Sequence, residues 1–168
     1  MGAADEPGDQ PRSVPSGVPE HLHTVTPRLV VGDGAAAIEF YAHAFGAQEL
    51  GEPFLEPGGR VIHAELQIGD SVIMITEEGV DADVPLRSPE KTVTAIMATY
   101  WRDVDAAWER AVGAGAEVIY PLEDQFYGER GGRLRDPFGQ QWMLSQRIEQ
   151  LTEAEMYRRA AEFFGRGD

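Results

Sequence analysis

Two stretches of the chain repeat the same succession of segments, and this internal duplication constrains the fold more than any other feature. Each stretch opens on a β-rich TVT segment and continues into a helical pattern that ends at glycine. FGAQEL at 45–50 has its counterpart in AGAEVI at 114–119, and GGRV at 58–61 has its counterpart in GGRL at 131–134. Similar words in the same order indicate a duplicated unit. We therefore expect two equivalent modules in tandem.

Hydrophobic periodicity predicts the same elements in each module, namely a strand, a helix and further strands. In the first module, over about 24–80, strands are expected at 24–31, 48–54, 60–68 and 71–75, with a helix at 35–45. In the second, over about 92–147, strands are expected at 92–101, 117–120, around 131–134 and at 141–145, with a helix at 104–112. The predicted class is α+β.

The two ends of the chain differ in character from the duplicated part. Residues 1–22 carry four prolines and scattered acidic groups, a composition typical of a disordered tail. Residues 150–168 follow the expected domain at 23–149, and Thr152 and Glu155 have the spacing of a capping box. We predict a C-terminal amphipathic helix there, with an apolar stripe that packs on the domain or on a second subunit.

Charge and composition exclude several classes of function. The formal net charge of the chain is −15. Nucleic acids bind to basic surfaces, which such an acidic chain does not offer, and the negative charge also opposes binding to anionic membranes. The absence of cysteine rules out disulfides, thiolate metal sites and cysteine nucleophiles. No apolar run reaches the length of a membrane span, and the start of the chain lacks the pattern of a secretory signal. We expect a cytoplasmic protein.

Four segments together resemble a known superfamily. They are RLVVGDGAAAIEFYAHAFGAQEL, VIHAELQIGDSVIMITEE, DVDAAWERAVGAGAEV and EDQFYGERGGRLRDPFGQQWML. They are similar to the vicinal-oxygen-chelate superfamily, which includes glyoxalases, bleomycin resistance proteins and dioxygenases, and most similar to its PhnB-like branch. The resemblance implies two βαβββ modules whose sheets curl around a cleft for a small molecule.

The resemblance also implies where a metal would bind, because each module of a metal-dependent member places one ligand on its first strand and one on its last. Those positions correspond here to Thr26 and Met74 in the first module, and to Ile96 and Met143 in the second. A hydroxyl, two thioethers and an alkyl group do not hold Mg²⁺, Zn²⁺ or Fe²⁺. We therefore predict no metal and no cofactor.

Strand alternation then predicts which side chains line the cleft. The expected ligand-binding residues are Thr26, Arg28, Met74, Ile96, Tyr100, Tyr127, Arg130, Gln141 and Met143. Such a lining, apolar with a few polar groups, is typical of a small-molecule pocket, although a solid core remains the alternative. The expected ligand is aromatic or planar.

Two groups of residues are candidates for catalysis. His63 and Glu65 share one face of a strand and suit a general-base pair, or else form the solvated side of that strand. Tyr127 is a candidate for proton transfer or ligand contact, and Arg130 for clamping an anion. The alternative for this segment is a structural turn in which Arg130 pairs with Asp124 or Asp136.

Three functions follow from these residues. The first is a metal-free binding protein that sequesters a small molecule, as drug-resistance proteins do. The second is a metal-free isomerase, cyclase or lyase of secondary metabolism that uses acid–base side chains. The third is a metal-dependent enzyme of the glyoxalase or dioxygenase type whose ligands lie elsewhere. A homodimer is compatible with each of them.

Overall fold

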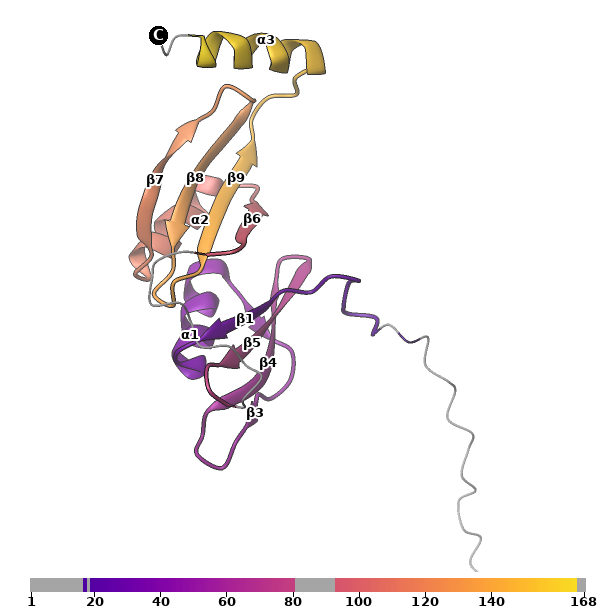
Figure 1. Cartoon of the computed structure of the whole chain (residues 1–168), viewed down its shortest axis with the longest axis vertical. Coiled ribbons are helices and arrows are strands. Elements are labelled where there is room, and N and C mark those ends of the chain that lie inside the picture. Colours follow the sequence, from indigo (N-terminus) through magenta and orange to yellow (C-terminus); the bar gives the residue numbers. More distant parts are fainter. Residues whose placement is uncertain (1–16, 18, 81–92, 166–168) are drawn as a thin grey trace, which may run out of the picture.

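A computed structural model describes residue 17 and the ranges 19–80 and 93–165 (Figure 1). The first module contains β1 (Arg28–Val31), α1 (Gly34–Phe45), β2 (Gln48–Glu49), β3 (Phe54–Leu55), β4 (Val61–Ile68) and β5 (Ser71–Glu77). The second contains β6 (Ile96–Tyr100), α2 (Val104–Gly113), β7 (Glu117–Asp124), β8 (Glu129–Arg135) and β9 (Gln141–Arg147). The chain then forms α3 (Glu153–Phe164).

The two modules have the same strand topology, which confirms the predicted duplication and the α+β class. One sheet has the order β1-β5-β4-β2, with β3 paired to β4, and the other has the order β6-β9-β8-β7. In each sheet the first strand of the module lies parallel to its last strand, and the remaining pairs are antiparallel. Neither sheet closes on itself (Figure 1).

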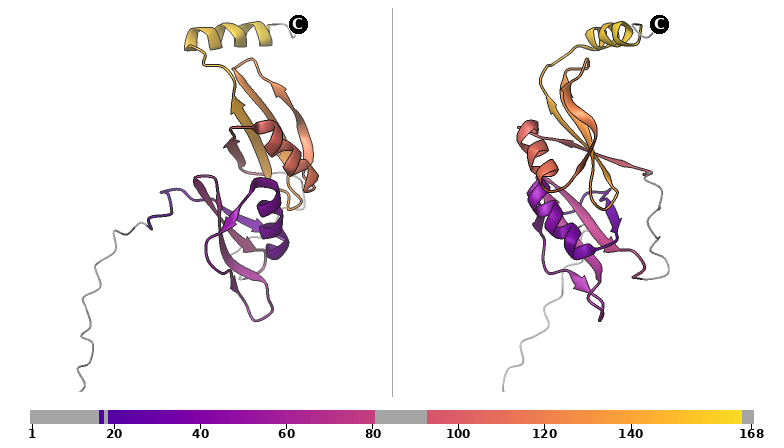
Figure 2. Two further views of the ribbon diagram at one scale, coloured as in Figure 1. Left: turned by 180° about the vertical axis from the view of Figure 1, so that it is seen from behind. Right: turned by 90° about the vertical axis from the view of Figure 1, so that its left-hand side faces the viewer.

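Helices cover only one face of each sheet. Asp33 and Asp103 cap α1 and α2 by accepting hydrogen bonds from backbone N–H groups in the first turn. Both helices lie on the same side of the sheets and contact each other (Figure 2, right). Their apolar faces and the facing strand residues form one core that runs through both modules. In the part of the chain that the structure describes, neither α1 nor α2 covers the opposite faces of the two sheets.

A buried carboxylate joins the modules. Asp136, in the turn between β8 and β9, accepts hydrogen bonds from the Tyr41 hydroxyl at 2.7 Å and from the Trp142 indole N–H at 2.8 Å. Its other oxygen accepts from the backbone N–H groups of Phe138 and Gln140. Burial raises the pKa of Asp136, and the four donated hydrogen bonds oppose that shift. This turn therefore ties α1 to the second module.

Several element boundaries differ from the sequence prediction. The first strand begins at Arg28 rather than at residue 24, because Pro27 has no N–H with which to extend the pairing. The strand expected at 48–54 is two short pieces, β2 and β3. Conversely, β7 and β8 are longer than expected. Most of the predicted tail lies outside the described residues.

The C-terminal helix forms where it was expected but buries little of its apolar stripe. Thr152 accepts a hydrogen bond from the N–H of Glu155, as the capping pattern predicts. None of the α3 residues is buried, and Phe164 is 71% exposed. The ring of Phe163 stacks on Phe126 in the β7–β8 turn at 4.8 Å, and Arg159 forms an ion pair with Glu149 at 2.8 Å. The helix thus contacts the domain through a few side chains while most of its surface stays exposed.

Candidate functional site

The uncovered face of the second sheet carries four of the nine residues predicted to bind a ligand, namely Ile96, Tyr100, Gln141 and Met143. Side chains alternate between the two faces of a strand, and Trp142 and Leu144 point into the core. The open face therefore carries the residues between them and their cross-strand partners. They are Ile96, Ala98 and Tyr100 from β6, Gln141, Met143 and Ser145 from β9, and Glu129, Gly131, Arg133 and Arg135 from β8.

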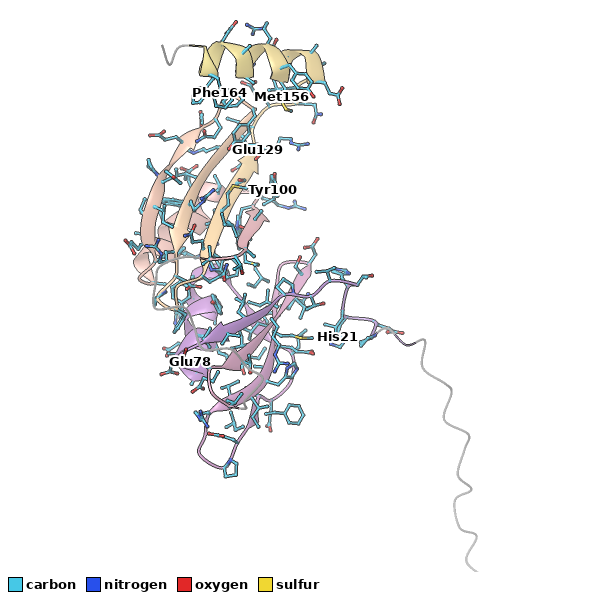
Figure 3. The ribbon with its side chains drawn as sticks, viewed as in Figure 1. His21, Glu78, Tyr100, Glu129, Met156 and Phe164 are labelled. Atoms are coloured by element: carbon cyan, nitrogen blue, oxygen red, sulfur yellow. The ribbon has the colours of Figure 1, made fainter. Side chains whose placement is uncertain are left out.

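At one end of this face lies a cavity of about 460 Å³, which we call the Tyr100 pocket. Its lining residues are Tyr100, Tyr127, Glu129, Met143, Arg147, Glu149, Gln150, Leu151 and Met156. Strands β6, β8 and β9 supply its floor, and the segment that leads into α3 supplies one wall. Figure 3 shows Tyr100 and Glu129 on the sheet, with Met156 on the neighbouring helix. Its volume suits a small organic ligand.

A hydrogen bond inside the Tyr100 pocket fixes its main polar group. The Tyr100 hydroxyl donates to Glu129 at 3.0 Å, and the Glu129 side chain is only 11% exposed. That hydrogen bond raises the pKa of Tyr100. Burial raises the pKa of Tyr127, with the Glu129 charge as a smaller cause. Both phenols are therefore protonated at neutral pH and act as donors, which disfavours Tyr127 as a general base.

The uncovered face of the first sheet brings together the other predicted residues. Glu65 lies beside Met74, and Met74 lies beside Arg28 in the next strand. The His63 and Glu65 side chains are 3.4 Å apart, Nε2 to Oε1, and both are partly exposed. The second Glu65 oxygen is 2.8 Å from His21 Nε2, so the segment before β1 contacts this face. Thr26 precedes the strand and donates to the His23 carbonyl.

The side chains at the implied metal positions do not fit a divalent ion. The cross-strand partners of Met74 are Arg28 and Glu65, and those of Met143 are Ala98 and Arg133. Glu65 is the one metal-ligating group among them, and thioethers, an alkyl group and cationic guanidinium groups do not supply the other donors that Zn²⁺ or Mg²⁺ requires. Within the ranges 19–80 and 93–165, no three His, Asp or Glu side chains are placed to share a metal ion.

Arg130 lies apart from the other predicted ligand-binding residues. It is adjacent to Glu129 in β8, so its side chain leaves the sheet on the helix side. There it forms ion pairs with Asp105 at 2.7 Å and with Asp124 at 3.0 Å. The structural-turn alternative is therefore the one that the geometry supports, with Asp105 in place of Asp136 as the second partner. An Arg130 already paired in this way does not clamp a ligand in the Tyr100 pocket.

Sequence reasoning missed Glu129, Arg133 and Arg147. Glu129 and Arg133 were not assigned to a face because the predicted strand began at Gly131, whereas β8 begins at Glu129. Alternation counted from Glu129 would have placed both on the face of Met143. The C-terminal wall of the pocket left no signal in strand periodicity, since it comes from a loop and a helix.

A second and larger cavity, of about 690 Å³, lies on the opposite side of the molecule between α1 and α2. Phe40, Phe138 and Pro137 form its apolar lining, and Arg110 and His43 lie at its polar side. None of the residues predicted to bind a ligand reaches it. By volume alone, this cavity would be the better candidate for the ligand-binding site. Aromatic and buried polar groups converge in the Tyr100 pocket, however, and this composition favours the Tyr100 pocket as the binding site.

Similar proteins agree with this architecture. A protein of Mycobacterium tuberculosis (strain H37Rv) is 40% identical over 141 residues, which is 79% of this chain and 79% of that protein. A protein of Arabidopsis thaliana is 30% identical over 131 residues, 73% of this chain and 75% of its own length. The crystal structure of TioX from Micromonospora sp. superposes with a TM-score of 0.57 at 24% identity, covering 74% of this chain and 99% of TioX.

The sequence model of one family matches most of the described chain. Residues 21–144, which include both modules, match the glyoxalase/bleomycin resistance protein/dioxygenase superfamily. The paired parallel first and last strands of each module are consistent with that match. None of the helices in the described part of the chain is long and apolar enough to cross a membrane. This protein therefore belongs to the glyoxalase/bleomycin resistance protein/dioxygenase superfamily.

Proposed function

We propose that this protein binds a planar or aromatic small molecule without a catalytic metal and sequesters it, as a drug-resistance protein does. The supporting observation is the composition of the Tyr100 pocket. Two phenol rings, the thioethers of Met143 and Met156 and one buried carboxylate surround it. Aromatic rings bind planar ligands by stacking, and methionine side chains adapt to irregular shapes.

Calorimetric titration with a panel of aromatic antibiotics tests this function. We expect at least one compound to bind, and Tyr100→Ala to weaken that binding about tenfold or more through loss of ring contact and of the Glu129 hydrogen bond. Tyr157→Ala is the matched control, because Tyr157 lies on α3, is 74% exposed and does not line the pocket. Equal affinities for the two variants would contradict the location of the site.

We also propose that two copies associate through their uncovered sheet faces. Large apolar side chains stand exposed on strands of both modules, including Phe54 at 68% and Ile96 at 40%. Exposed apolar patches of this kind mark interaction surfaces. Light scattering coupled to size exclusion should give twice the mass of the 18.4 kDa chain. A mass of one chain at micromolar concentration would contradict the dimer.

A second candidate function is metal-free acid–base catalysis on the first module's face. His63 and Glu65 are close enough for the carboxylate to orient the imidazole, and neither is fully buried. Conversion of a substrate by the purified protein should then be lost in His63→Ala and kept in His43→Ala, whose histidine lies on α1. Equal turnover in these two variants would exclude His63 as the base.

A further inference from the structure

We infer that Arg133 is an anion-binding residue, and that the ligand of this protein is a planar aromatic compound that carries a carboxylate. This inference rests on the proposed binding function and adds the chemical class of the ligand. It is carried by the position of Arg133 on the open face, by its lack of a carboxylate partner among the described residues, and by the rings and the thioether near it.

Arg133 lies at the centre of the uncovered face of the second sheet. Its cross-strand neighbours are Tyr120 on β7 and Met143 on β9, and Met143 also lines the Tyr100 pocket. The guanidinium carbon is 5.2 Å from the centre of the Tyr120 ring, within the range of a cation–π contact. The charge of Arg133 also acts on Tyr127, which lines the same pocket. Arg133 is not itself a lining residue, but it lies directly beside Met143, which lines the Tyr100 pocket.

The hydrogen bonding of Arg133 is incomplete. Its Nε is buried and has no hydrogen-bond partner. Leaving such a donor unpaired costs free energy, and the cost is larger for a charged group. Because Nε is buried, a ligand would bind the two terminal nitrogens, whose N–H groups match the two oxygens of a carboxylate. A guanidinium without an ion pair among the described residues is thus the feature that a ligand carboxylate would satisfy.

The Nε of Arg135 is also buried without a hydrogen-bond partner, so what sets Arg133 apart from the other arginines of β8 and β9 is the lack of an ion pair among the described residues. The sequence has 29 acidic and 14 basic residues, so carboxylates are plentiful. Arg130 pairs with Asp105, Arg135 with Glu117 at 3.0 Å, and Arg147 approaches Glu129 at 3.9 Å. Among the residues that the structure describes, no carboxylate forms an ion pair with Arg133. Among the described residues of the second sheet's uncovered face, the guanidinium of Arg133 is therefore available to bind an anionic group of a ligand.

The rest of the face fits the aromatic part of such a ligand. Tyr127 and Met143 line the Tyr100 pocket with a ring and a thioether, and Met143 is the cross-strand neighbour of Arg133. The competing ligand class is a cation attracted to Glu129. That carboxylate, however, already accepts from Tyr100 and lies near Arg147. The observations favour the anion, because the unsatisfied group is the arginine.

Three probes of one ring shape separate these classes, namely naphthalene-2-carboxylate, naphthalene-2-carboxamide and 2-naphthylmethylammonium. Each is titrated calorimetrically into the full-length protein at pH 7. We expect the carboxylate to bind about ten- to a hundredfold more tightly than the amide, the range for a charge-assisted hydrogen bond. Arg133→Gln should remove that preference and leave amide binding unchanged.

Arg110→Gln is the matched control, because it makes the same change of charge on α2, beside the cavity on the helix side. Unchanged carboxylate binding in this variant supports the inference, whereas a loss confined to Arg110→Gln overturns it. Equal affinity of the wild type for carboxylate and amide, or a preference for the ammonium compound, overturns the inference and leaves the proposed function intact. If none of the three binds, both are contradicted.

Discussion

Replacing Asp136 with alanine removes the acceptor that joins the two modules. Four donors lose their partner at once, namely the Tyr41 hydroxyl, the Trp142 indole N–H and the backbone N–H groups of Phe138 and Gln140. Tyr41 is 0% exposed and Trp142 is 2% exposed, so water does not replace the carboxylate at these two side chains. The change is therefore expected to destabilise the fold and not merely the turn.

The size of the effect follows from those two buried donors. Each unpaired buried donor costs about 1–3 kcal/mol. Removing the carboxylate also removes its own desolvation cost, which offsets part of the loss. We expect Asp136→Ala to lower the free energy of unfolding by about 3 kcal/mol, a large share of the roughly 5–15 kcal/mol that holds a domain folded.

A double-mutant cycle with Tyr41→Phe makes the test sharper. In the wild type, Tyr41→Phe removes a hydrogen bond and should cost about 1 kcal/mol. In the Asp136→Ala background the same change removes an unpaired hydroxyl, so it should restore about 1 kcal/mol. Urea unfolding, followed by tryptophan fluorescence, gives all four stabilities, and an unchanged m-value shows that the variants unfold by the same transition.

Two results would refute this reasoning. One is a loss below about 1 kcal/mol for Asp136→Ala, the lower limit for a single unpaired donor. The other is a Tyr41→Phe cost of the same sign and size in both backgrounds, which would mean that the hydroxyl does not depend on Asp136.

Three further predictions concern the second module. Because burial raises the pKa of Asp136 in the folded protein, the stability that its protonated form contributes is present below the unfolded pKa of about 3.9 and is lost as pH rises through the folded pKa. The stability of the wild type relative to Asp136→Asn should therefore fall as pH rises from 3 in unfolding titrations, and a rise would contradict the shift. Gly132→Ala should unfold at a markedly lower temperature, since its Cβ would lie 2.6 Å from the Trp108 ring and 2.9 Å from the Pro121 carbonyl oxygen. Gly113→Ala, at the end of α2 with nothing within 4 Å, should instead gain about 0.4–1 kcal/mol in the same melts, and a loss there would contradict the open space.

Features that depend on neighbouring residues in the chain were predictable. The similar sequence segments in the two halves predicted the two modules, and the glycines at the end of each helical pattern predicted where α1 and α2 end. The capping pattern at Thr152 gave the start of α3. Alternation in β9 placed Gln141 and Met143 on one face, and it placed Tyr100 rather than Trp101 toward that face. These signals are local, because backbone geometry fixes which side chains share a face.

Features that depend on contacts between distant segments were not predictable. Arg130 was a candidate ligand-binding residue until the position of Asp105 on α2 gave it a partner 25 residues away in sequence. Glu129 lines the Tyr100 pocket because β8 begins two residues before the predicted strand. Met156 lines it because α3 lies next to the second sheet, which strand periodicity does not predict. The sequence by itself determined the modules and the acidic charge. Only the tertiary structure decided which charged groups find partners, because ion pairs and burial depend on distances that no periodicity encodes.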